Sequence, residues 1–200
     1  MTLLLYLFGV LVISGRSWRS TTRQKPCPRS PLVEIGVDGV EAVGPEDTAE
    51  ELLCKLWKTG YENGELKTPL FEDVIPTLEA WKHVGKTLVI FSSGSVQAQL
   101  QFFSVVEDGS STRDLKPLFA AHFDPTIAGS KLEKSSYQKI CSELGQDAAS
   151  VTFLTDNVKE AEAAHAADMY AVLVDRPGNA ALSVEDRERF PVIERLTDIP

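Results

Sequence analysis

Short apolar runs alternate with amphipathic segments along most of the chain after residue 68. Runs rich in Val, Leu, Ile and Phe that are too short for buried helices predict strands at 88–91, 151–155 and 170–174. Apolar residues at helical spacing predict helices at 69–85, 96–103, 130–144 and 158–167. Strands that alternate with helices predict an α/β fold, in which a parallel sheet carries helices on both faces.

Weaker patterns fill the rest of this region. The polar stretch 105–113 predicts a surface loop, and 123–127 predicts a short strand. Ser130 and Glu133 have the spacing of a capping box at the start of a helix. Near the C-terminus, the pattern predicts a polar helix at 184–189 and a short apolar strand at 192–193.

The first third of the chain has a different pattern. Residues 3–13 form an unbroken apolar run, which is too short for a bilayer span and fits either a secretory signal or a first buried strand. Residues 14–31 show no hydrophobic period, which is typical of a loop or a disordered segment. Residues 32–43 carry a weak strand signal, and 45–60 predict a helix that ends at Gly60.

Composition narrows the functional classes. A chain of 200 residues with 43% hydrophobic and 24% charged residues is typical of a globular protein with a sizeable core. A net charge of -9 argues against nucleic acid and anionic membranes as partners. The first thirty residues nevertheless hold five basic residues and no acid, and are therefore compositionally unlike the remainder. The three cysteines are far apart, which favours free thiols in a reducing compartment.

Polar side chains follow two of the predicted strands where each strand ends. Ser92, Ser93 and Gly94 come directly after the first strand, and Ser95 is placed to cap the next helix. Hydroxyls, a glycine and a helix amino terminus at the carboxyl end of a strand favour a phosphate site, although a turn rich in small residues has the same composition.

Lys131 and Asp156 complete the candidate site. Lys131 would balance phosphoryl charge, and the Asp156 carboxylate suits Mg²⁺. The plainer readings are a solvated lysine in a capping box and an aspartate that caps a helix. Glu160, one helical turn after Asp156, can serve the metal or orient its ligands, but covalent phosphoryl transfer needs a further acid as nucleophile.

Several segments, in order, resemble the enolase-phosphatase (acireductone synthase) of methionine salvage, a branch of the haloacid dehalogenase superfamily. They are 56–70, 91–99, 123–127, 131–137, 153–157 and 176–180. The resemblance covers about residues 53–198. It implies a haloacid dehalogenase-like (Rossmann-like) core at 71–200, a remnant of a helical cap at 46–70, and an atypical, partly disordered segment at 1–45.

The resemblance also implies an activity and a site. Enzymes of this family enolise and then dephosphorylate 2,3-diketo-5-methylthiopentyl-1-phosphate with one Mg²⁺. Ser92, Ser93 and Lys131 then correspond to the substrate-binding residues, and Asp156 to a metal ligand. The family implies a monomer in the cytoplasm, and in eukaryotes also in the nucleus, with a small phosphorylated substrate and no nucleic acid or membrane as partner.

One motif of the family is missing. Its first strand ends in Asp-x-Glu-Gly-Thr, whereas residues 1–30 contain no acid, and 36–40 place a glycine at the nucleophile position. The sequence therefore predicts no catalytic nucleophile, weak or absent Mg²⁺ binding, and a gap in the sheet that 3–13 or 32–37 would fill. We expect a truncated or mis-spliced enzyme; the alternatives are a non-catalytic phosphate-ligand-binding or regulatory protein, and a doubly wound binding domain related by fold alone.

Overall fold

The computed structural model describes residues 8–13, 59–60, 63 and 67–199. These residues form a sheet in the order β5-β2-β1-β6-β7-β8 and a separate hairpin, β3-β4. The strands are β1 Phe8–Ile13, β2 Thr87–Ser92, β3 Val106–Asp108, β4 Ser111–Arg113, β5 Phe119–Phe123, β6 Val151–Thr155, β7 Tyr170–Val174 and β8 Val192–Ile193. The helices are α2 Val74–His83, α3 Val96–Phe102, α4 Pro125–Ala128, α5 Lys134–Leu144, α6 Val158–Ala166 and α7 Val184–Arg189, with short 3-10 turns η1 Lys116–Leu118, η2 Ala148–Ser150 and η3 Leu196–Asp198.

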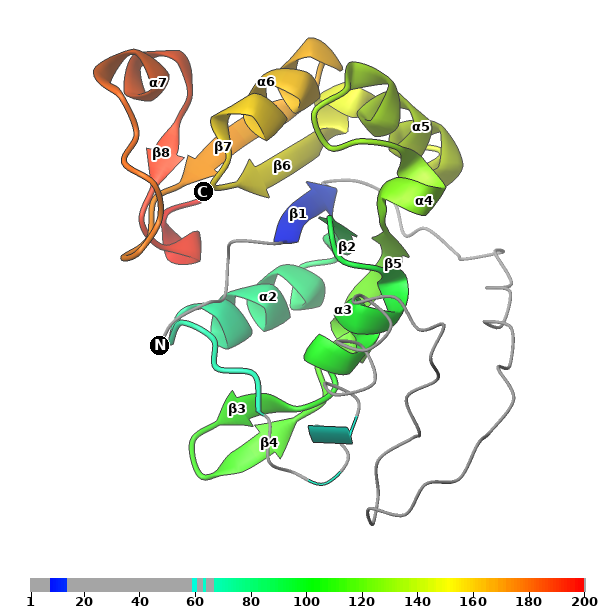
Figure 1. The fold of residues 1–200 in the computed structure, drawn as a ribbon, viewed down its shortest axis with the longest axis vertical. Coiled ribbons are helices and arrows are strands. Elements are labelled where there is room, and N and C mark those ends of the chain that lie inside the picture. The colour runs from blue at the N-terminus through cyan, green and yellow to red at the C-terminus, as the bar shows by residue number, and fades with distance from the viewer. Residues whose placement is uncertain (1–7, 14–58, 61–62, 64–66, 200) are drawn as a thin grey trace, which may run out of the picture.

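Helices cover both faces of the six-stranded sheet, as the sequence predicts (Figure 1). On one face, Leu11, Phe91 and Phe153 pack in the same buried cluster as apolar residues of α5 and α6. On the other face, Val12 and Ile90 share a cluster with residues of α2 and the C-terminal turn η3. Because successive residues of a strand point to opposite faces, the continuous apolar runs of β1 and β2 supply both cores.

The predicted α/β fold with a parallel sheet is confirmed, except that one strand runs antiparallel. β2 and β5 pair in parallel, as do β6, β7 and β8, but β1 lies between β2 and β6 and is antiparallel to both. Residues 8–13 thus fill the gap that the sequence left in the sheet. Since β1 runs the opposite way, its first residues lie beside the carboxyl ends of its neighbours, with Phe8 opposite Ser92.

Most of the predicted helices and strands are confirmed, including β2, β6 and β7, and α6 and α7. The stretch 105–113, predicted as a loop, contains the hairpin β3-β4, whose turn uses Gly109 at φ +62°. The strand predicted at 123–127 lies earlier, as β5, because Asp124 and Pro125 start a helical turn there. The helix predicted from Pro69 begins at Val74.

The expectations for the N-terminal third lie mostly outside the described residues. This applies to the helix predicted at 45–60 apart from its last two residues, and to most of the segments 1–45 and 46–70. Of the helices that the structure describes, none combines the length and the hydropathy that crossing a bilayer requires.

Candidate active site

Two of the predicted site residues lie at one rim of the sheet. Ser92 is the last residue of β2, and Asp156 directly follows β6. Between them stands the start of β1, because Phe8 pairs with Ser92 and Val10 pairs with Leu154. The carboxyl ends of β2, β5, β6 and β7 meet at this rim, which is where α/β sheets bind ligands.

The loop that follows β2, residues 92–95, is compact. Ser92 is fully buried, and its Oγ accepts a hydrogen bond from the Gly94 N–H at 3.0 Å. Ser95 caps α3 as predicted, accepting from the Ala98 N–H at 3.2 Å, and Ser93 is exposed. The Val96 N–H at the start of α3 already donates to Asp124 Oδ2 at 3.0 Å, so this amide is engaged inside the protein.

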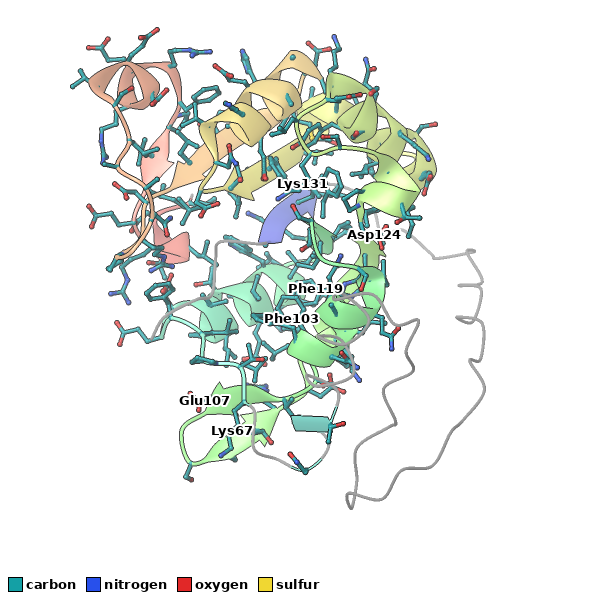
Figure 2. The ribbon with its side chains drawn as sticks, viewed as in Figure 1. Lys67, Phe103, Glu107, Phe119, Asp124 and Lys131 are labelled. Carbon is teal, nitrogen blue, oxygen red and sulfur yellow. The ribbon has the colours of Figure 1, made fainter. Side chains whose placement is uncertain are left out.

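Lys131 is buried beside β2 instead of being solvated. Its Nζ lies 2.6 Å from Glu160 Oε2 and 6.0 Å from the centroid of the Phe91 ring, which precedes Ser92 (Figure 2). Tyr137 fixes the backbone of Lys131, because its hydroxyl donates to the Lys131 carbonyl at 2.7 Å. The predicted capping box is wrong: α5 starts at Lys134, and Ser130 Oγ accepts from the Leu132 N–H.

Glu160 links the lysine to β6. Its Oε2 accepts from the Thr155 hydroxyl at 2.8 Å as well as from Lys131. The carboxylate of Glu160 is therefore committed to Lys131. Burial, and to a smaller extent the Glu160 charge, raise the pKa of Asp156, against the opposing effect of the Lys131 charge.

The described residues do not fit a complete Mg²⁺ site. A magnesium ion takes oxygen ligands in octahedral geometry. Among the acids beside the rim strands, Asp124 accepts from two backbone amides, Asp175 pairs with Arg187 and Glu160 pairs with Lys131, which leaves Asp156 as the candidate ligand. Within the described ranges, no three His, Cys, Asp or Glu side chains converge as a metal would require. The sequence of β1, Phe-Gly-Val-Leu-Val-Ile, supplies no carboxylate to the rim either.

An apolar cavity of about 40 Å³ opens beside Asp156 on the α2 side of the sheet. Its other walls are Val10, Leu70, Phe71, Val74, Leu78, Phe102, Phe103, Phe119, Leu154, Thr155, Val174 and Leu196. The volume exceeds what one water needs, and the walls are mostly hydrocarbon. The rim thus combines polar groups from β2, α6 and the loop before α5 with an apolar recess.

Two residues that support the rim were not identified from the sequence. Gln99 and Asp124 contact the 92–95 loop and the start of α3 through side-chain hydrogen bonds. Both are single polar residues, and Gln99 falls within an otherwise helical pattern, so only their position in the fold reveals the contacts. The sequence placed Ser92, Ser93, Lys131 and Asp156 at one edge. The structure puts Ser92 and Asp156 at the ends of β2 and β6, pairs Lys131 with Glu160, and leaves Ser93 exposed.

The chain is similar to several fungal proteins named Enolase-phosphatase E1. It is 47% identical over 146 residues to that of Podospora anserina, covering 72% of this chain and 62% of the relative. It is 39% identical over 158 residues to that of Komagataella phaffii, covering 79% of this chain and 66% of the relative. The resemblance found in the sequence is confirmed, and the chain spans about two thirds of these relatives or slightly less.

Solved structures agree on the fold. The UTR4 protein of Saccharomyces cerevisiae superposes with a TM-score of 0.66 at 33% identity, over 73% of this chain and 64% of that one. The L-2-haloacid dehalogenase RSc1362 shares the fold, with a TM-score of 0.54 at 17% identity over 68% of this chain and 57% of that one. Residues 35–168 match the sequence pattern of haloacid dehalogenase-like hydrolases. Sequence pattern, sheet and relatives agree, and the chain belongs to the haloacid dehalogenase-like hydrolase family.

Proposed function

We propose that this chain carries the core of an enolase-phosphatase-type hydrolase of methionine salvage, which recognises 2,3-diketo-5-methylthiopentyl-1-phosphate by its phosphate. The observation that supports the proposal is that Ser92 and Asp156 stand at the carboxyl ends of β2 and β6, with the Lys131 ammonium 6.0 Å from the ring of Phe91, the residue before Ser92. The similarity to proteins named Enolase-phosphatase E1 supports the choice of substrate.

The roles of the residues follow from their chemistry. Ser92 and Ser93 offer hydroxyls to phosphoryl oxygens, and Lys131 offers an ammonium whose position Glu160 fixes. The apolar cavity beside Asp156 suits a short thioether chain. Ser92 and Lys131 therefore bind and orient the phosphate, and the cavity excludes water from the rest of the substrate.

Catalysis needs groups that the described residues do not supply. Asp156 is the proposed Mg²⁺ ligand, and one carboxylate holds the ion weakly. We propose that the chain binds the substrate but turns it over poorly, because β1 brings no aspartate to the rim. Loss of a covalent nucleophile lowers turnover by roughly 10⁴- to 10⁶-fold. We further propose that the protein is a monomer and that it acts in the cytoplasm, and in eukaryotes also in the nucleus.

A non-catalytic phosphate-ligand-binding or regulatory protein is the second candidate. The direction of β1 favours it, because an antiparallel strand puts the apolar residues Phe8 to Val10 where the family carries its acids. In this case Ser92, Ser93 and Lys131 retain the ligand and no hydrolysis follows.

Phosphate binding tests both candidates, and turnover tests the expectation of impaired or absent catalysis that they share. Isothermal titration of the full chain with inorganic phosphate should show binding that Lys131→Ala abolishes, while Arg189→Ala, a distant and half-exposed cation, keeps it. Phosphate release from the diketo substrate with Mg²⁺ should stay at background. Asp38 is the acid within the segment 36–40 that imitates the missing motif. Clear turnover that Asp38→Asn abolishes would overturn the expectation of impaired catalysis, and no binding at all would overturn both candidates.

A further inference from the structure

The Gln99 side chain is completely buried in α3, one turn after the 92–95 loop. Its Nε2 donates to the carbonyl oxygens of Gly94 and Phe123, both at 2.9 Å. Its Oε1 lies 3.0 Å from His122 Nδ1. Because an amide oxygen only accepts, the His122 ring carries its proton on Nδ1, and both donor hydrogens of Gln99 are used on backbone carbonyls.

Asp124 makes a second tie to the same loop. Its Oδ2 accepts from the Val96 N–H and its Oδ1 from the Ile127 N–H, each at 3.0 Å. Gln99, which also binds the Phe123 carbonyl, and Asp124, the residue after β5, thereby hold the chain on either side of Ser95. The side chains of Gln99 and Asp124 thus anchor the loop after β2 to the end of β5.

The Gln99 contact also sets the direction of a peptide group. In a planar trans peptide the C=O and the next N–H point opposite ways. Since the Gly94 carbonyl is directed at Gln99, the Ser95 N–H points away from it. Glycine has more backbone freedom than any other residue, so an unanchored Gly94 would leave this orientation unfixed.

We infer that Gln99 is a positioning residue for phosphate recognition. It holds the Gly94 carbonyl so that the 92–95 loop presents its hydroxyl and amide donors to a phosphate monoester in one conformation. The inference rests on the proposed function, because it needs the phosphate at this loop. Gln99 acts through Gly94 and does not itself contact the ligand; its effect is to order the site before binding.

The test compares two glutamines of one helix. Gln99→Met removes the clamp with little change in volume, and Gln101→Met is the matched control because Gln101 Oε1 has no hydrogen-bond partner among the residues that the structure describes. The probe is inorganic phosphate, titrated against the full chain and followed by ³¹P NMR. Gln99→Met removes the contacts to Gly94, Phe123 and His122, of which the Gly94 contact is the one that orients the loop. It should weaken binding about tenfold, the most that the loss of this one hydrogen bond ordinarily gives, and Gln101→Met should not.

Hydrogen exchange of the loop amides, measured without phosphate, separates positioning from general damage. Gln99→Met should speed exchange at residues 93–96 while the amides of β6 and β7 keep their protection. A second substitution, Gly94→Ala, should then restore affinity about two- to fivefold by narrowing the freedom of the loop. The added methyl has room, at 3.5 Å from Ser92 Oγ.

Unchanged affinity together with unchanged loop exchange in Gln99→Met would overturn the inference. If the unaltered protein binds no phosphate, the proposed function fails, whereas the exchange comparison still decides whether Gln99 orders the loop. If circular dichroism shows that Gln99→Met is unfolded, Gln99→Asn is used in its place. Its side chain, shorter by one methylene, withdraws the amide from the Gly94 carbonyl, and it should give the same two changes.

Discussion

Lys131 Nζ lies 2.6 Å from Glu160 Oε2, and the two side chains are only 6% and 10% exposed. Removing one partner of such a pair leaves the other charge buried without compensation. Lys131→Met or Glu160→Leu alone should therefore lower the free energy of unfolding by about 3 to 5 kcal/mol, whereas the double substitution should lower it much less. Urea unfolding at neutral pH measures all three.

The exposed pair Arg189–Glu162 provides the control for that cycle, because its side chains are 47% and 42% exposed. Arg189→Met should change the free energy of unfolding little, since solvent screens such pairs. Additive effects of Lys131→Met and Glu160→Leu in the double variant would mean that the two charges do not interact, and would contradict the geometry described above.

Asp73 joins three distant parts of the chain. Its Oδ2 accepts from Arg176 Nη2 at 2.6 Å and from the Leu196 N–H at 2.7 Å, and the Arg176 guanidinium lies over the Phe71 ring. We expect Asp73→Asn to lower the free energy of unfolding by about 3 kcal/mol, because the buried Arg176 loses its counter-charge. Thermal unfolding should show the loss, and Glu72→Gln, an exposed neighbouring acid, should not.

The same carboxylate gives that prediction a pH dependence. Burial raises the pKa of Asp73, but the hydrogen bonds and charge of Arg176 and the Leu196 N–H outweigh it and lower the pKa below the usual 3.8. A lowered pKa stabilises the fold above pH 3.8 and loses that effect as the pH falls further. The difference in the free energy of unfolding between Asp73→Asn and the unaltered protein should therefore become smaller as the pH falls below 3.8.

His122 should make stability fall on mild acidification. Burial lowers its pKa from 6.5 to about 4, with the rings of Phe103 and Phe119 nearby. The unfolded chain then binds a proton that the folded chain rejects, so stability is full above pH 6.5 and is lost as the pH falls toward 4. The loss amounts to about 3 kcal/mol.

Comparison of His122→Gln with the unaltered protein isolates this effect. The glutamine does not titrate. Between pH 7.5 and pH 4.5, the unaltered protein should therefore lose about 3 kcal/mol of unfolding free energy relative to His122→Gln. A difference that stays constant over this range would show that His122 keeps an ordinary pKa. Acids elsewhere affect both proteins alike and cancel in the comparison.

Much of the fold was predictable because local patterns and tertiary structure agree. The apolar runs of β2, β6 and β7 and the glycine that ends α5, Gly145 at φ +61°, carry their own signals. The direction of β1 was not predictable, since an apolar run pairs equally well either way along a gap in a sheet. In the observed direction Gly9 pairs with Phe91 and lies against the Phe153 ring, a contact that no local pattern indicates.

The site shows the same division. Residue type and position after a strand pointed to Ser92 and Asp156 as candidates, and the order of motifs pointed to Lys131. The Lys131–Glu160 pair was not predicted, because its partners are far apart in sequence and belong to different elements. Side-chain networks of this kind depend on rotamers and burial, which no local pattern encodes.

The antiparallel placement of β1 can be tested at Gly9. A Cβ added to Gly9 would lie 2.3 Å from Phe153 Cε2, so Gly9→Ala forces a fully buried ring to move. We expect Gly9→Ala to lower the free energy of unfolding by about 1 to 3 kcal/mol, as overpacking does.

Gly94→Ala, whose Cβ meets only ordinary contacts, is the control. Phe153→Leu in the Gly9→Ala background should recover part of the loss, because the smaller side chain makes room for the methyl. Independent, additive effects of Gly9→Ala and Phe153→Leu in urea unfolding would place Gly9 away from Phe153, and would require a different register or direction for β1.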